Sequence, residues 1–237
     1  MVRPLNYPVT PMPITRRPLL AAPLILAAPS LARAQGSWFP IRGADGREVQ
    51  NHRVPIELET EFSELDNAFT IGSPDADVTL IEIYDSNCGY CRRAAQDVKA
   101  MVAADPDLAV TFINAPSLGL PSVQAARVEY AVKLVGGADK VLAFHEASMA
   151  ARGVFDGLRA LETAKAIGLD DNQIEDVADK PETGQVLVQA TRLANATNLA
   201  ATPSWLASGT AIIGWPGRPV LEGVIRSIRQ CDKPVCG

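Results

Sequence analysis

Two patterns of hydrophobic positions follow each other in the first half of the chain, and their order predicts an α/β unit. Residues 78–84 are Val-Thr-Leu-Ile-Glu-Ile-Tyr, a run rich in β-branched side chains that indicates a buried strand. Residues 91–104 instead place apolar side chains three or four positions apart, as an amphipathic helix does. The run at 108–113 is again typical of a strand. We therefore expect a strand, a helix and a second strand over residues 78–113.

A block of helices is expected in the middle of the chain. From Ser122 to about Asn198, strand-like runs disappear and helix-forming residues dominate. Glycines and one proline divide this block into five expected helices, at residues 123–135, 140–151, 157–167, 172–179 and 182–198. The block therefore interrupts the α/β pattern.

The α/β pattern resumes after the helical block. Residues 201–206 and 211–213 predict a hairpin, and helically spaced apolar residues from Pro219 to about Cys231 predict a final helix. The expected fold class is α/β, with an all-helical block inserted between a β-α-β half and a β-β-α half. The expected parts are an N-terminal arm with no more than one short strand (35–70), an α/β domain (71–118 and 199–231), the helical insert (119–198) and a C-terminal tail (232–237).

The first 34 residues have the layout of an export signal. Arg16-Arg17 is followed by an apolar stretch at 18–28 and then by Ala32-Arg33-Ala34, which fits a cleavage site for small residues. The arginine pair also fits a twin-arginine signal. We expect residues 1–34 to be removed and the mature protein to lie in the periplasm; the alternative is an uncleaved membrane anchor.

Composition and charge narrow the class of protein further. With 47% hydrophobic and 21% charged residues, the chain has the composition of a globular protein. Its formal net charge is −5, and removal of residues 1–34 takes away four arginines and no acidic residue. Neither nucleic acid nor an anionic membrane surface is expected as a partner of such an acidic protein. All four cysteines lie beyond residue 34, and cysteines form lasting disulfides in an oxidising compartment.

The tetrapeptide Cys88-Gly89-Tyr90-Cys91 lies where the first predicted strand is followed by the first predicted helix. Cys88 is therefore expected at a helix N-terminus, where unpaired backbone N–H groups and the helix dipole favour a thiolate. Cys91 lies one helical turn further on, close enough to form a disulfide with Cys88. The pair predicts a redox-active dithiol, with Cys88 as nucleophile and Cys91 as resolving thiol. A structural disulfide or half of a zinc site are the alternatives.

A second cysteine pair, Cys231 and Cys236, follows the last predicted helix. We expect a structural disulfide that holds the C-terminus, which a loop-entropy model values at about 2 kcal/mol for so small a ring. The alternatives are an auxiliary redox pair that passes electrons to Cys88 and Cys91, free thiols, or metal binding. No bound metal and no other cofactor is expected.

Residues 82–93, Glu-Ile-Tyr-Asp-Ser-Asn-Cys-Gly-Tyr-Cys-Arg-Arg, together with Ala201-Thr202-Pro203 resemble the DsbA-like branch of the thioredoxin superfamily. The resemblance covers most of residues 68–230 and implies a thioredoxin fold. It also implies that the Thr202–Pro203 bond is cis and that Pro203 packs against the cysteines. Glu82 matches a buried acid of these proteins that helps to move the proton of the second cysteine; its strand alone also allows a solvated position.

Further residues near the dithiol are expected to contact substrate. Thr202 and Pro203 should shape a groove for an extended peptide, with Gly89 and Tyr90 beside it. Trp205 follows the proline closely and fits two interpretations, a wall of this groove or a core aromatic residue.

The sequence departs from the resembled family at two places. The Pro-His dipeptide between the cysteines of DsbA is here Gly89-Tyr90, so the histidine that helps to hold the thiolate in strong oxidants is absent. Isomerases of this group usually assemble through an N-terminal domain, and the arm at 35–70 is too short for one. A monomer is therefore expected.

These observations predict an exported thiol–disulfide oxidoreductase. Its expected partners are secreted proteins with cysteines and a membrane redox partner that resets Cys88 and Cys91. The same two residues would also serve a disulfide isomerase or a reductase. The alternative from another class is an exported binding or metal-handling module in which the CxxC pair is structural.

Overall fold

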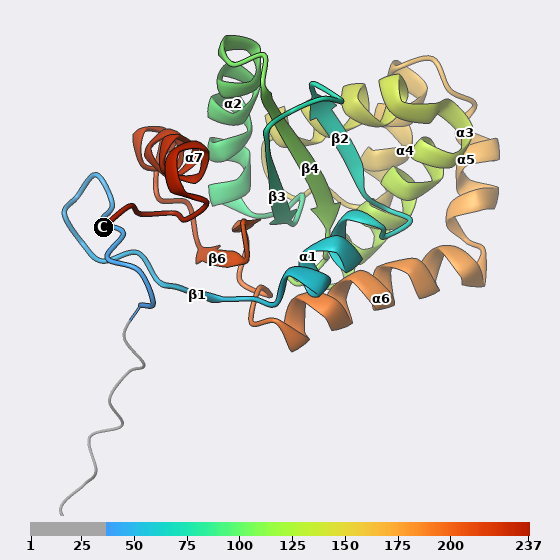
Figure 1. The fold of residues 1–237 in the computed structure, drawn as a ribbon. Helices are drawn as coiled ribbons and strands as arrows, with labels where there is room; N and C mark the ends of the chain where they lie inside the picture. The colour runs from blue at the N-terminus through green and yellow to red at the C-terminus, as the bar shows by residue number, and fades with distance from the viewer. Residues whose placement is uncertain (1–36) are drawn as a thin grey trace, which may run out of the picture. The chain divides into compact units, whose positions relative to one another are not determined.

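A computed structural model describes residues 37–237 (Figure 1). The predicted export signal, residues 1–34, lies outside the described residues. The strands are β1 (Asn51–Arg53), β2 (Phe69–Gly72), β3 (Val78–Tyr84), β4 (Leu108–Asn114), β5 (Ser204–Ala207) and β6 (Thr210–Ile213). The helices are α1 (Ile56–Ser63), α2 (Gly89–Ala104), α3 (Leu120–Ala150), α4 (Gly157–Ala166), α5 (Asp171–Ala178), α6 (Pro181–Ala196) and α7 (Arg218–Cys231).

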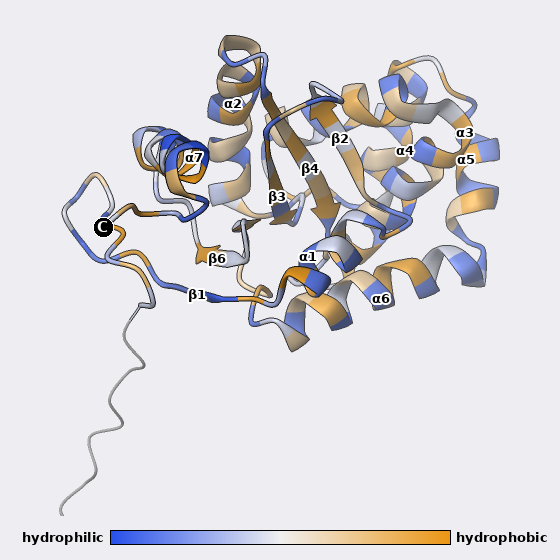
Figure 2. Ribbon diagram, in the orientation of Figure 1, coloured by the Kyte–Doolittle hydropathy of each residue, from blue (hydrophilic) through white to orange (hydrophobic). Residues whose placement is uncertain are grey.

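The six strands form one mixed sheet in the order β1-β6-β5-β3-β4-β2. β3 and β4 are parallel and are connected through α2, whereas every other neighbouring pair is antiparallel. Both of these strands are mostly apolar, as the orange colour in Figure 2 shows. The expected β3-α2-β4 half and β5-β6-α7 half thus lie in one sheet, and the fold class is confirmed.

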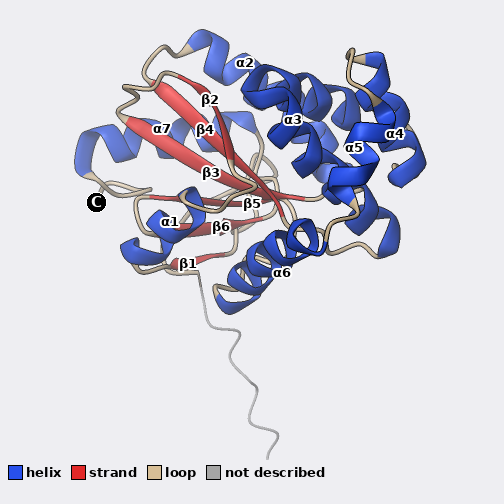
Figure 3. Cartoon of the chain, turned by 90° about the vertical axis from the view of Figure 1, so that its right-hand side faces the viewer, coloured by secondary structure: helices blue, strands red, loops and turns tan. Residues whose placement is uncertain are grey.

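Helices cover both faces of this sheet, and each face has its own core (Figure 3). Successive side chains of a strand point to opposite faces, so Leu80 and Tyr84 join the larger core while Ile81 and Ile83 join the smaller one. The larger core is closed by α2, α7 and α3–α5, and the smaller core by α1 and α6. Both cysteines of the CxxC pair belong to the larger core.

The helical insert begins with α3, which the sequence pattern had divided into two helices. The division is real in part: Gly137 has φ 74° and ψ −166°, so the helix is interrupted there but resumes at once. Asp156 and Asp170 then cap α4 and α5, accepting hydrogen bonds from the backbone N–H groups of Arg159 and Gln173. Although α3 has 31 residues, neither it nor any other helix within residues 37–237 is long and apolar enough to cross a membrane.

The N-terminal segment has more regular structure than its sequence suggested. Residues 35–70 were expected to form an arm, with one short strand at the most, but β1, α1 and the first half of β2 lie there. β1 pairs with β6 at one edge of the sheet, and β2 pairs with β4 at the other. These elements have three to eight residues each, so their stability comes from the sheet and core rather than from local sequence.

The hairpin β5–β6 turns at Ser208 and Gly209, which have φ values of 50° and 68°. Positive φ at both central residues is the geometry of a tight two-residue hairpin. The carboxylate of Glu59 on α1 accepts hydrogen bonds from both turn amides, at 3.2 Å from Ser208 and 2.7 Å from Gly209. The segment before the CxxC pair therefore holds the hairpin that follows the insert.

Gly72 provides a test of how closely β2 packs on the sheet. Its φ is 99°, and a Cβ at this position would lie 2.2 Å from the carbonyl oxygen of Leu108. We expect Gly72→Ala to lower the free energy of unfolding by more than about 2 kcal/mol, because strained backbone and a backbone clash add together. Gly46 is the matched control: it also has positive φ, but a Cβ there meets no atom within 4 Å.

Urea denaturation of the two variants would measure the difference. Gly46→Ala should cost about 1 kcal/mol, from the backbone conformation alone. Equal losses for the two variants would contradict the close approach of Gly72 to Leu108.

Candidate functional site

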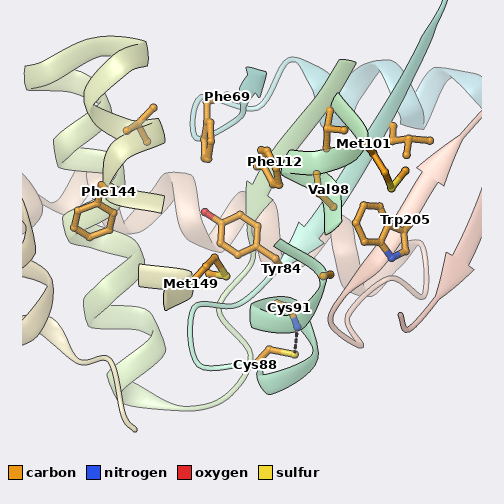
Figure 4. Packing of buried hydrophobic residues seen from close by; sticks show 14 of the residues in the cluster. Phe69, Tyr84, Cys88, Cys91, Val98, Met101, Phe112, Phe144, Met149 and Trp205 are labelled. Carbon is orange, nitrogen blue, oxygen red and sulfur yellow. Dashed lines mark hydrogen bonds between the residues drawn. The ribbon is translucent and has the colours of Figure 1, made fainter. Parts of the chain in front are cut away.

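Cys88 is the N-cap residue of α2, at the point where the polypeptide leaves β3. Its backbone is extended, and its Sγ accepts a hydrogen bond from the backbone N–H of Cys91 at 3.4 Å (Figure 4). Both residues are thiols without a disulfide bond. The cysteines differ in access, because Cys88 is 6% exposed and Cys91 is fully buried. Only Cys88 can therefore meet another protein.

The surroundings of Cys88 stabilise its thiolate. The hydrogen bond from the Cys91 thiol is the largest cause, and it lowers the pKa of Cys88 to about 5. Burial acts against this shift, while Thr202 and the backbone N–H groups of Cys91 and Tyr90 reinforce it. Donors at a helix N-terminus favour an anion in this way.

Cys91 has the opposite behaviour. Burial is the main reason that its pKa lies well above the ordinary value, and its hydrogen bond to Cys88 and the nearby charge of Glu82 add to the effect. At neutral pH the dithiol therefore consists of one thiolate at the surface and one thiol beneath it. This asymmetry separates a nucleophile from a resolving group.

Glu82 lies on β3 and is 2% exposed, so the solvated position that its strand allowed is excluded. It has the same parity as Leu80 and Tyr84 and so faces the larger core, which contains both cysteines. Burial, with a smaller contribution from the Cys88 thiolate, raises the pKa of Glu82 well above the usual range. Its Oε2 has no hydrogen-bond partner among the described residues.

The segment before β5 contacts Cys88, because β5 is the neighbour of β3 in the sheet. The Thr202–Pro203 peptide bond is cis, and the Cys88 thiol donates a hydrogen bond to the carbonyl oxygen of Thr202 at 3.2 Å. Pro203 is buried, and its carbonyl oxygen accepts from the N–H of Gly214 at 2.9 Å. The fold thus brings together two segments that lie 114 residues apart in sequence.

A groove lies beside the dithiol, between the N-terminal segment and the residues that follow β6. It is lined by Tyr90, Thr202, residues 43–45, 47–50 and 213–217. Tyr90 is 57% exposed, with the guanidinium of Arg93 stacked 4.1 Å from the centre of its ring. Gly89 is also exposed, and a Cβ there would meet no atom within 4 Å. Gly89 and Tyr90 are therefore accessible and Thr202 is partly exposed, whereas Pro203 and one further residue expected beside the substrate are buried.

That further residue is Trp205, for which the sequence left two interpretations open. It is 1% exposed, its ring lies 5.6 Å from that of Trp215, and its indole N–H donates to the carbonyl oxygen of Gly214. Figure 4 shows it among core side chains near Met101. Trp205 is thus a core aromatic residue, and its assignment to the substrate groove is corrected.

Cys231 and Cys236 form a disulfide at the C-terminal end of α7. The N-terminal end of α7 adjoins Gly217 in the groove, so the length of this helix, about 20 Å, separates the disulfide from that end. The described residues therefore provide no direct contact by which this disulfide could pass electrons to Cys88.

Several polar residues beside the dithiol escaped the sequence analysis. Asp85 is fully buried between β3 and Cys88, and Asn87 and Arg92 flank the nucleophile. One signal could have found them: Asp85-Ser86-Asn87 is a polar run inserted between an apolar strand and an apolar helix face. Within residues 37–237, no group of three or more His, Cys, Asp or Glu side chains is arranged to hold a metal ion.

Fold and site together define a class of protein. A dithiol at the N-terminus of a helix, beside a cis-proline that precedes the neighbouring strand of a mixed sheet, is the arrangement of thioredoxin-fold oxidoreductases.

Comparisons with known proteins agree with this class. The thioredoxin family model matches residues 64–219. A thioredoxin-like oxidoreductase from Silicibacter pomeroyi is 32% identical, with a TM-score of 0.65 over 71% of this chain and 98% of its own. The thiol-disulfide exchange protein alpha-DsbA2 from Wolbachia pipientis is 22% identical, with a TM-score of 0.66 over 73% and 92%. The catalytic domain of Proteus mirabilis ScsC is 21% identical, with a TM-score of 0.64 over 74% and 98%.

The last two structures share the fold at low identity, while the family model and the Silicibacter protein establish descent. No curated protein sequence matches the chain. The chain belongs to the thioredoxin family. It shares its fold with the DsbA-type protein alpha-DsbA2.

The asymmetry of the dithiol can be measured directly. In reduced protein, ultraviolet absorbance of the thiolate should show one cysteine that ionises with a midpoint near pH 5, and Cys88→Ser should abolish this step. Because the unfolded value is about 8.5, the pKa of Cys88 is lowered on folding. The free energy of unfolding, relative to that of Cys88→Ser, should therefore increase as the pH rises from 5 to 8.5. The same stabilisation is lost as the pH falls through this range towards 5. A midpoint near 8.5 would contradict the assignment.

Proposed function

We propose that this protein is an exported oxidoreductase that exchanges disulfides with secreted protein substrates through Cys88 and Cys91. The observation that carries this proposal is the asymmetry of the dithiol, with a low pKa at the accessible sulfur and a raised pKa at the buried one. A purely structural disulfide has no need of such a difference.

The oxidised pair would react in two steps. A substrate thiolate attacks Cys88 Sγ, the Cys88–Cys91 bond breaks, and Cys91 leaves with the electron pair and takes up a proton. A second substrate thiolate then attacks the substrate sulfur bound to Cys88, and Cys88 leaves as a thiolate. The substrate dithiol is oxidised to a disulfide, and the CxxC disulfide is reduced to a thiol and a thiolate.

Glu82 is suited to supply the proton for Cys91. It is buried on the cysteine side of β3, and its raised pKa favours the protonated form. Once Glu82 is ionised, its charge would disfavour a thiolate at Cys91. A carboxyl group with a raised pKa can act as a general acid and a general base.

Thr202 and Pro203 are suited to hold the substrate. The carbonyl oxygen of Thr202 already contacts Cys88 Sγ, and the groove past Tyr90 provides room for an extended peptide. Hydrogen bonds between the substrate backbone and the Thr202–Pro203 segment would place a substrate sulfur at Cys88, with little dependence on the substrate's sequence.

The low pKa of Cys88 also favours a direction of electron flow. A stabilised thiolate stabilises the reduced protein, so the disulfide form is the better oxidant. The protein would therefore donate disulfides and be reset by a membrane redox partner. The disulfide at Cys231–Cys236 supports an oxidising compartment such as the periplasm.

The use of the N-terminal segment favours oxidation over isomerisation. Residues 51–72 are used at the edges of the sheet and against its smaller core, and they do not form a separate assembly domain. A monomer would then present one dithiol at a time, as a donor of disulfides does.

A refolding assay with reduced ribonuclease tests the proposal. The oxidised protein should restore ribonuclease activity, whereas Cys88→Ala and Cys91→Ala, which cannot form the CxxC disulfide, should have no effect above background. With scrambled ribonuclease, Cys91→Ala should accumulate mixed disulfides on non-reducing gels, because Cys88 can attack a substrate disulfide but the thiol that would release it is gone. Cys231→Ala/Cys236→Ala should keep full activity and serves as the control. Equal activity of wild type and Cys88→Ala would refute the proposal, and faster recovery from scrambled than from reduced ribonuclease would assign an isomerase instead.

Glu82→Gln tests the proton-transfer role. The variant should slow the first oxidation step on the order of a hundredfold, the usual scale of general acid–base catalysis. The titration of Cys88 should stay near pH 5, because Glu82 is not among the causes of its shift. Stopped-flow kinetics would measure the rate, with the exposed Glu57→Gln as control. An unchanged rate would remove Glu82 from the mechanism.

A further inference from the structure

Asn87, the residue before the nucleophile, is held by the helical insert. Its Nδ2 donates to Ser122 Oγ and to the carbonyl oxygen of Phe155, both at 3.0 Å, and its Oδ1 accepts from the N–H of Phe155 at 2.7 Å. One side chain therefore joins the active-site turn to the start of α3 and to the loop before α4. Phe155 itself is buried, so this anchor is set in the core.

Asp85 holds the other end of the same turn. Its carboxylate accepts hydrogen bonds from Ser122 Oγ and from the N–H of Asn87 on one oxygen, both at 2.8 Å. The other oxygen accepts from the N–H groups of Ser117 and Leu118, at 2.8 and 3.0 Å. Ser122 thus bridges the side chains of Asp85 and Asn87.

Arg92, in the first turn of α2, closes the arrangement. Its Nε donates to the carbonyl oxygen of Ser86 at 2.9 Å, and its guanidinium reaches the carbonyl oxygen of Gly153 at 2.9 Å and Asn87 Oδ1 at 3.5 Å. The turn itself is closed by a hydrogen bond from the N–H of Cys88 to the carbonyl oxygen of Asp85 at 3.0 Å.

These contacts constrain where the sulfur of Cys88 can lie. The geometry that stabilises the thiolate requires Sγ to meet the backbone N–H of Cys91, at 3.4 Å, and the side chain of Thr202 at once. Cys88 is the last residue of a four-residue turn, so a shift of that turn would move the sulfur away from these partners. None of the contacts of Asn87 is to a cysteine or to the groove, so its effect would be indirect.

We propose that Asn87 is a positioning residue through which the helical insert fixes the turn that carries Cys88 and so sets the reactivity of the dithiol. This inference rests on the proposed function, because it concerns the same two cysteines. It gives the insert a role in the chemistry beyond covering the sheet.

Asn87→Ala is the direct test. Loss of the anchor should raise the measured pKa of Cys88 and reduce the thiolate-to-thiol ratio near neutral pH by about tenfold, which corresponds to a fall in reduction potential of about 30 mV. The amide of Phe155 should exchange its hydrogen faster, because its acceptor is gone. Asn51→Ala is the matched control: like Asn87, Asn51 makes side-chain hydrogen bonds to the backbone, here of Phe39 and Val49, but it does not touch the active-site turn.

The outcomes separate the two proposals. Faster exchange at Phe155 with an unchanged Cys88 pKa and reduction potential would overturn the positioning role while leaving the proposed function intact. Equal changes in Asn51→Ala would also overturn it, as a general effect of lost stability. A wild-type protein with no reversible dithiol couple would instead refute the proposed function. If Asn87→Ala does not fold, Ser122→Ala removes one contact of the same anchor and should give a smaller shift in the same direction.

Discussion

The hydrogen bonding between the two sulfurs of the CxxC pair is the interaction on which the site depends. It requires Cys88 to sit at the helix terminus, where backbone donors stabilise an anion, and Cys91 to be buried, where an anion is costly. Neither condition can be met by a short peptide. The first needs a helix of fixed length and position, and the second needs a core that excludes water from one side of that helix.

The fold supplies both conditions by bringing separate segments to one point. The end of β3, the start of α2 and the cis-proline segment meet at Cys88, while the insert holds the turn between the first two. The insert also contributes Phe144, Met149 and Phe155 to the core that buries Cys91. A mobile insert would therefore loosen the nucleophile and hydrate the resolving thiol at the same time.

The sequence could predict the parts whose periodicity is independent of tertiary contacts. β3, α2 and the β5–β6 hairpin appeared in the parts of the chain where they were expected. It could not predict α1 and β2, because α1 buries only Phe62 and β2 exists through its pairing with β4. The hydrogen bond of Trp205 in the core joins residues 9 apart in sequence, and the one between Phe155 and Asn87 joins residues 68 apart. No local sequence pattern predicts such contacts.

Three buried carboxylates near the site show where polar groups serve structure and where they do not. Asp85 accepts four hydrogen bonds, and Glu129 accepts from the hydroxyl of Tyr84 and the amide of Asn114. Glu82 is as buried as these, yet one of its oxygens has no partner among the described residues. An unsatisfied buried carboxyl costs stability, and an apolar side chain of similar size would avoid that cost. Its position beside the thiol that must gain and lose a proton is a reason, under the proposed mechanism, for this acid to be unsatisfied.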